Sequence, residues 1–115
     1  MVRVPDEIVG ELGRALGVGD EVVGGFIGWL LGSYLTKHRS VGLLRLVVDV
    51  LRSGDARVVG FRRALGISSS IDVKININDA SFNRLYTAVR GVVRALAKAG
   101  SVEYIEELNV INSVK

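Results

Sequence analysis

The residues that could carry catalytic chemistry are few in this sequence, and they form no catalytic motif. The chain has no cysteine and a single histidine, His38, whose neighbours Lys37 and Arg39 are not catalytic partners. A cysteine nucleophile and a thiolate metal site are therefore excluded, and a Ser-His-Asp triad or a histidine metal site would depend on His38 alone. The glycines match neither a phosphate-binding loop nor a dinucleotide-binding fingerprint. We predict a protein with no catalytic residues, no metal, no cofactor and no small-molecule substrate.

One segment near the C-terminal end favours a different chemistry, the binding of phosphate. Residues 80–99 have the spacing of an amphipathic helix, with apolar residues such as Phe82 and Leu96 on one side. The opposite side carries Lys, Arg, Asn and Thr but no acid, whereas surface helices usually mix Glu with Lys and Arg. Lys and Arg contact nucleic-acid backbones, and Asn, Thr and Arg bond base edges. A solvated outer face is the alternative interpretation. We predict a nucleic-acid-binding surface, the cationic face, formed by Asn83, Thr87, Arg90, Arg94 and Lys98.

The charge distribution contains basic blocks that the net charge of +3 conceals. Residues 37–63 include seven basic and two acidic side chains, whereas residues 1–36 include two basic and five acidic ones. Three further acids, Glu103, Glu106 and Glu107, follow the basic helix. A partner with phosphate groups is therefore expected. Duplex DNA is the favoured partner, and RNA is the alternative.

The 115 residues and their apolar share of 49% are typical of one domain spanning 1–115. Residues 1–38 are predicted to form a pair of helices, the first ending at Gly17 and the second capped by Asp20 and running to about Leu35. Glycines recur at every fourth position of the second helix, which makes a seam where another backbone can approach closely. That partner is either a helix of the same chain or a second copy, and we expect a homodimer. This glycine seam consists of Gly24, Gly28 and Gly32.

The rest of the chain predicts further helices and some β structure. Helices are expected over 41–52 and over 55–65, the second of which Gly66 closes. In the second segment, β-branched residues and an internal glycine make a strand the alternative. Alternating apolar and polar residues over 71–77 predict a strand. Residues 102–114 fit a hairpin and a helix equally well. The predicted fold class is therefore mainly α with a small β component.

Two stretches of residues 43–115 share the pattern of a known family. The first is LLRLVVDVLRSGDARVVGFRRALGISSS, which predicts a helix, a break, a second helix and a turn. The second is FNRLYTAVRGVVRALAKAGSVEYIEE, a long helix ending in small residues, glycine and valine. Together they resemble the winged helix-turn-helix superfamily. The resemblance implies a winged-helix-like region over 40–115 whose long helix enters the major groove. It places Asn83, Arg84, Thr87 and Arg90 nearest the bases, and Arg94 and Lys98 nearer the backbone.

Membrane insertion and secretion are not indicated. The most apolar stretch, residues 22–35, has 14 residues, whereas about 20 are needed to span a bilayer. The first ten residues have no apolar run behind a basic start, so they do not resemble a signal peptide. We expect a cytoplasmic protein without membrane contact. The absence of Cys and Gln is typical of proteins from thermophiles.

The sequence supports two functional hypotheses. The first is a small basic DNA-binding protein, a transcriptional regulator or chromosome-associated factor, that binds duplex DNA through the cationic helix. The alternative is a non-catalytic helical subunit of a larger ribonucleoprotein complex, such as the small subunit of an archaeal CRISPR interference complex. Binding of duplex DNA by the purified protein distinguishes the two.

Overall fold

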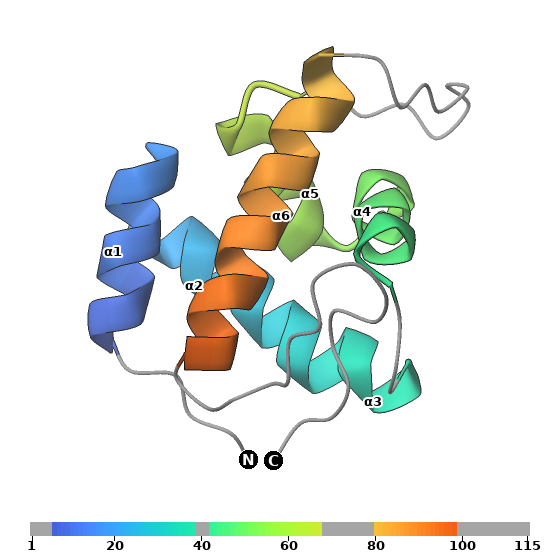
Figure 1. Ribbon diagram of the computed structural model, residues 1–115, viewed down its shortest axis with the longest axis horizontal. Helices are drawn as coiled ribbons and strands as arrows, with labels where there is room; N and C mark the ends of the chain where they lie inside the picture. Colours follow the sequence, from blue (N-terminus) through green and yellow to red (C-terminus); the bar gives the residue numbers. More distant parts are fainter. Residues whose placement is uncertain (1–5, 39–41, 68–79, 99–115) are drawn as a thin grey trace.

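The computed structural model describes residues 6–38, 42–67 and 80–98, and these residues form helices joined by short connections. Figure 1 shows the order of the elements along the chain. The helices are α1 (Asp6–Leu16), α2 (Asp20–Trp29), the π-helical segment η1 (Leu30–Tyr34), α3 (Leu35–Lys37), α4 (Leu43–Arg52), α5 (Ala56–Ala64) and α6 (Ala80–Lys98).

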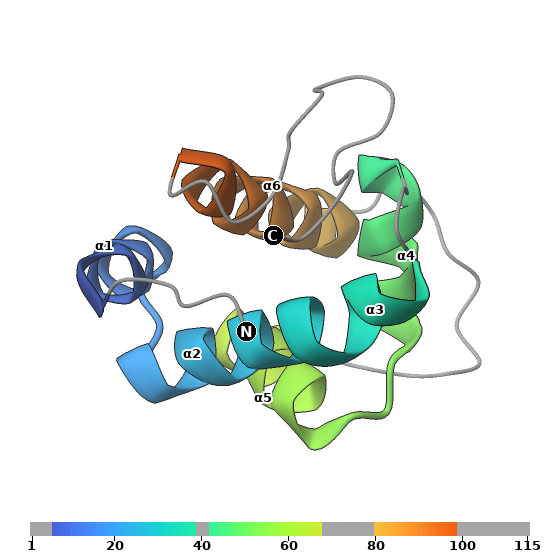
Figure 2. The same cartoon turned by 90° about the horizontal axis from the view of Figure 1, so that it is seen from below.

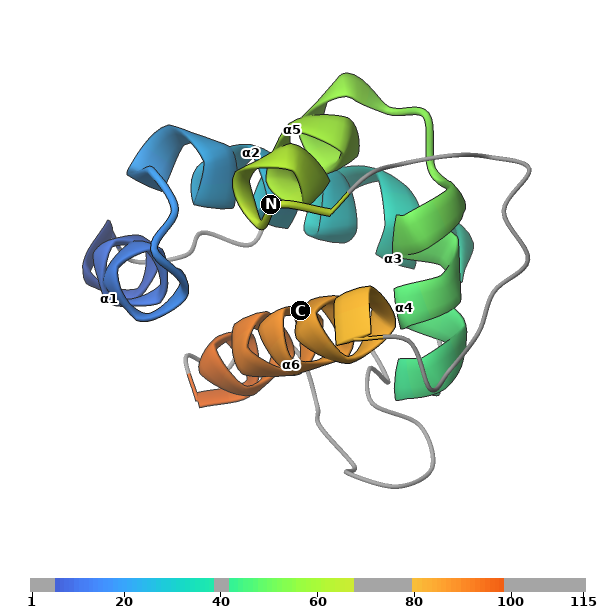
Figure 3. The same ribbon diagram turned by 90° about the horizontal axis from the view of Figure 1, so that it is seen from above.

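The long helix α6 is placed by contacts with helices on both of its sides. It packs against α1 and α4, while the most extensive contact in the molecule joins α2 to α5. Figure 2 shows α1 and α4 at opposite ends of the molecule. Figure 3 shows α6 on one side, with α2 and α5 on the other. In Figure 1, α1 and α6 run in opposite directions, so the last turn of α1 lies beside the first half of α6.

The core between these layers is apolar and includes the inner face of α6. Phe26 of α2 stacks on Phe61 of α5, with ring centroids 4.1 Å apart. These two rings are fully buried. The buried side of α6 consists of Phe82, Leu85, Ala88, Val89, Val92, Val93 and Leu96. Burial of these side chains fixes the rotation of α6 about its axis and turns the cationic face outward.

Two helices end in the same way because the sequence repeats Leu-Gly-apolar at their C-termini. Gly17 and Gly66 have φ values of 69° and 75°, the left-handed region that glycine adopts without strain. Beyond them, the N–H of Val18 donates to the carbonyl of Gly13 (2.8 Å) and the N–H of Ile67 donates to the carbonyl of Arg62 (3.0 Å). Each glycine thus closes a Schellman motif. The predicted stops at both glycines are confirmed.

The alternative between helix and strand at 55–65 is resolved in favour of a helix. Asp55 is the N-cap of α5, and its carboxylate accepts a hydrogen bond from the N–H of Arg57 at 2.9 Å. An N-cap is worth about 1 kcal/mol, whereas Val costs a helix at most about 0.7 kcal/mol relative to Ala. The cap and the burial of Val58 and Phe61 therefore outweigh the β preference of this segment.

The predicted fold class, mainly α with a small β component in a winged-helix-like domain, is wrong for the described chain. Every regular element in residues 6–38, 42–67 and 80–98 is a helix, and none is a strand. The β component was expected from alternation at 71–77 and from 102–114, and both segments lie outside the described residues.

The second predicted helix also differs from a uniform α-helix. Asp20, the predicted cap, is instead the first residue of α2, because Gly19 is the N-cap. The helix changes to π-helix at Leu30–Tyr34 and ends at Lys37. None of the helices in the described ranges is long and apolar enough to cross a membrane on its own. Only α1 and Asp20–Lys37 taken together have the length and composition of a membrane span, and these two segments are bent by 114° relative to each other.

Candidate nucleic-acid interface

The cationic face lies on the outer side of α6. Asn83, Thr87, Arg94 and Lys98 are exposed, and Arg90 is half-buried. No acid occurs among the 19 residues of α6 or among the nine residues of α5. Lys98 lies in the last turn of α6, where a positive charge also interacts favourably with the helix dipole. The face therefore presents cations and uncharged hydrogen-bonding groups together.

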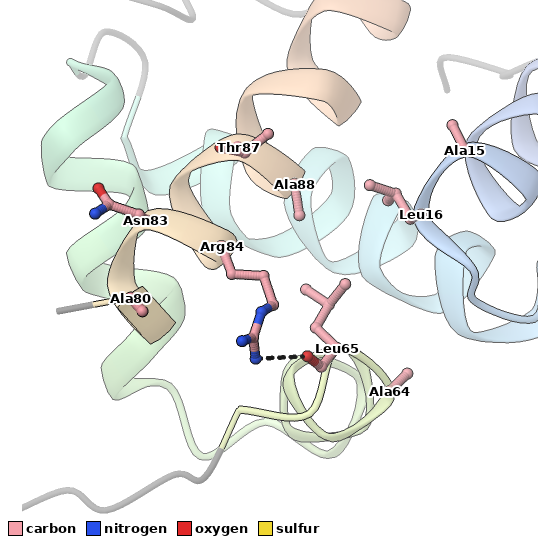
Figure 4. A pocket seen from close by; sticks show the side chains of 9 residues that line it. All are labelled: Ala15, Leu16, Ala64, Leu65, Ala80, Asn83, Arg84, Thr87 and Ala88. Carbon is pink, nitrogen blue, oxygen red and sulfur yellow. Dashed lines mark hydrogen bonds between the residues drawn. The ribbon is translucent and has the colours of Figure 1, made fainter.

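The remaining predicted site residue, Arg84, is exposed and also bonds to the end of another helix. Its Nη1 donates to the carbonyl of Leu65 at 3.3 Å, so α6 is tied to the C-terminal end of α5 (Figure 4). A cation at a helix C-terminus bonds carbonyls that have no partner within the helix. This contact could not be predicted from the sequence, because the two residues are 19 positions apart.

A cleft of about 540 Å³ opens between the ends of α1, α5 and α6. Figure 4 shows Arg84 reaching from α6 toward Leu65, with Leu16 of α1 on another side. Three of the predicted site residues, Asn83, Arg84 and Thr87, line this cleft, while Arg90, Arg94 and Lys98 lie farther along α6. The full lining is Ala15, Leu16, Ala64, Leu65, Ala80, Asn83, Arg84, Thr87 and Ala88.

Arg62, one of the seven basic residues of 37–63, is not available to a ligand. Arg62 is only 2% exposed and is the one charged side chain that is buried among the described residues. Its Nη1 donates to the carbonyls of Val50, Leu51 (2.8 Å) and Ser53 (2.8 Å) at the C-terminal end of α4. Burial lowers the pKa of its guanidinium, although arginine remains charged at neutral pH. Arg62 therefore holds the turn between α4 and α5.

His38 lies at the end of a series of packed rings. The series follows α2, η1 and α3 and consists of Phe26, Trp29, Tyr34 and, at the end of α3, His38. The ring centroids of Tyr34 and His38 are 4.5 Å apart. The Tyr34 hydroxyl donates to Asp49 of α4, which also pairs with Arg45 at 3.3 Å. Burial and this hydrogen bond raise the pKa of Tyr34 above its usual value.

No metal-binding cluster accompanies these groups in the described part of the chain. No cluster of three or more His, Asp or Glu side chains suited to a metal ion is present there. Among the acids of residues 6–38, Asp6, Glu7, Asp20 and Glu21 lie in the first turns of α1 and α2, and Glu11 lies in the middle of α1. The helices that carry the acids thus differ from those that carry the cationic face.

The glycine seam is not used for close packing within the described residues. A Cβ atom added at Gly24, Gly28 or Gly32 would meet nothing within 4 Å. By contrast, a Cβ at Gly13 would come within 2.8 Å of the Val18 carbonyl. The open space at the seam removes the intramolecular explanation for its glycines, as far as the described helices are concerned.

Comparisons with known proteins identify no relative of this chain. No protein-family model, no curated protein and no solved structure matches the chain. The site must therefore be interpreted from its own chemistry.

Proposed function

We propose that this protein binds nucleic acid, with duplex DNA as the favoured ligand, through the cationic face of α6. The observation that carries the proposal is the division of α6 into two sides. One side is buried in the core, and the other exposes Asn83, Thr87, Arg94 and Lys98 with no acid on the helix. Basic side chains on one protruding helix supply the phosphate contacts that dominate affinity for nucleic acid.

The position of α6 supports contact with a large, charged polymer. It occupies one side of the molecule in Figure 3, away from α2 and α5. A helix placed in this way can approach a groove of DNA without interference from the α2–α5 pair, and the major groove is wide enough for one helix. Thr87 and Arg94 are two turns apart on the same face, so contacts with bases and phosphates can form together.

The experiment is a fluorescence-anisotropy titration of a labelled blunt DNA duplex at low salt. The variant Arg94→Ala/Lys98→Ala removes two exposed cations from α6, and we expect its affinity to fall about tenfold. The matched control is Arg52→Ala/Arg57→Ala, which removes the same charge from exposed positions at the α4–α5 turn. Equal affinities of the two variants would show that the cationic face is not the interface.

The uncovered glycine seam favours a second candidate function, a helical assembly subunit of a larger ribonucleoprotein complex. Gly28 and Gly32 are exposed, and such positions allow another helix to approach closely. Under this proposal the protein contributes a packing surface and does not bind nucleic acid alone. Retention of duplex DNA by the purified protein, with loss in Arg94→Ala/Lys98→Ala, contradicts the second candidate and supports the first.

A further inference from the structure

The cleft between α1, α5 and α6 combines an apolar lining with polar groups on one wall. Alanines contribute from all three helices, and Leu16 and Leu65 are half-buried, so apolar surface remains open to a ligand. The polar wall belongs to α6, where Arg84 and Thr87 are exposed and line the cleft. Figure 4 shows Arg84 on the side of α6 that faces Leu65, whereas the side chain of Asn83 points away from it.

We propose that this cleft accepts one unpaired base of the nucleic acid whose phosphates lie along α6. The inference rests on the proposed function and adds a subsite to it, so an unpaired base at an overhang, a gap or a single strand should strengthen the phosphate binding along α6. A base has flat apolar faces and a hydrogen-bonding edge. The alanines and leucines suit the faces, and the hydroxyl of Thr87 suits the edge.

Arg84 provides a surface on which a base can stack. Its guanidinium is planar and is held by the hydrogen bond to the Leu65 carbonyl at 3.3 Å. Splayed bases of single strands commonly stack on arginine planes as well as on aromatic rings. The contact with Leu65 thus orders the side chain before the ligand arrives, which lowers the entropy lost on binding.

The polar wall distinguishes a base from the apolar side chain of a protein partner. Thr87 forms no side-chain hydrogen bond with another of the described residues, so its hydroxyl retains its hydrogen-bonding capacity. An inserted leucine or phenylalanine would cover this hydroxyl without bonding it, and a polar group buried without a partner weakens binding. A base forms the hydrogen bond instead.

The cleft is continuous with the rest of the cationic face. Arg90 and Arg94 follow Thr87 by about 4.5 and 10.5 Å along the helix axis. A strand whose base enters the cleft therefore has its neighbouring phosphates within reach of these side chains. On α1, Arg14 lies in the turn that lines the cleft, Glu11 lies one turn before it, and Asp6 and Glu7 lie in the first turn.

The test compares an intact DNA single strand of about 12 nucleotides with an abasic strand that has the same number of phosphates. Wild-type protein should bind the intact strand about tenfold more tightly in anisotropy titrations. The variant Ala64→Met fills the cleft from an exposed position and should remove this preference while its affinity for the abasic strand is unchanged. Its control is Ala56→Met, an exposed alanine at the other end of the same helix.

A second variant is included in case Ala64→Met disturbs the fold. Thr87→Val removes the edge contact from an exposed position and should reduce the preference several-fold. Equal binding of the two strands by wild-type protein overturns the base-binding inference but leaves phosphate binding intact. Equal preferences in Ala64→Met and Ala56→Met also overturn it. Failure of every strand and duplex to bind at low salt instead contradicts the proposed function.

Discussion

At the scale of single residues, Arg62 shows how a guanidinium stabilises a turn. Its Nη1 serves three carbonyls at the end of α4, and its Nε has no hydrogen-bond partner within the described part of the chain. The charge is compensated by carbonyl dipoles at a helix C-terminus, where positive charge is favourable. The sequence could not distinguish Arg62 from its neighbour Arg63, because both follow Phe61 in a basic run.

Arg62→Ala should lower the free energy of unfolding by about 2–4 kcal/mol. The change leaves buried carbonyls without a donor and creates a cavity at a position that is 2% exposed. Urea unfolding followed by circular dichroism measures the difference. Arg63→Ala is the matched control, because Arg63 is exposed, and it should change stability by about 0.5 kcal/mol or less. Similar losses in the two variants would contradict the role of Arg62.

Tyr34 makes the free energy of unfolding vary with pH in the alkaline range. Because its pKa is raised in the folded state by burial and by Asp49, its contribution is complete below the unfolded pKa of about 10 and is lost as pH rises above it. Tyr34→Phe should be less stable than wild type at pH 7, since it leaves Asp49 without this donor. The difference should shrink above pH about 10. Urea unfolding at several pH values tests this, and a constant difference would contradict it.

At the scale of elements, the helices were predictable where an apolar stripe coincided with a strong terminus signal. Residues 80–98 and 43–52 have clear apolar stripes, and Gly17 and Gly66 end their helices as expected. The π-helical segment at Leu30–Tyr34 was not predicted, because no residue pattern separates it from an α-helix. Its origin lies in tertiary packing, which a single helical period does not describe.

Gly28→Ala should raise the free energy of unfolding by about 1 kcal/mol. Glycine costs a helix about this amount, and the added Cβ meets nothing within 4 Å. Gly13→Ala is the control in another helix and should destabilise the protein, because its Cβ would lie 2.8 Å from the Val18 carbonyl. Chemical denaturation at two protein concentrations measures both. If Gly28→Ala instead lowers stability and makes it depend on concentration, the glycine seam is a dimer interface.

At the scale of the whole molecule, packing determines which charges can act together. The sequence located the cationic face on α6, and the structure places its residues on the outer side of that helix. The cleft with α1 and α5 could not be predicted, since Leu16, Leu65 and Thr87 come from three separate parts of the chain. The burial of Arg62 could not be predicted either, because it depends on contacts between α4 and α5.

The separation of charges between helices should be visible in the salt dependence of DNA binding. Each phosphate contact contributes about 0.9 to the slope of log affinity against log salt for duplex DNA. Arg94→Ala/Lys98→Ala should therefore reduce the magnitude of the slope by about two. Arg52→Ala/Arg57→Ala lowers the net charge equally but from the other side of the molecule, so its slope should match wild type. Anisotropy titrations between about 50 and 200 mM salt measure both slopes. Equal reductions would mean that net charge, and not the cationic face, governs binding.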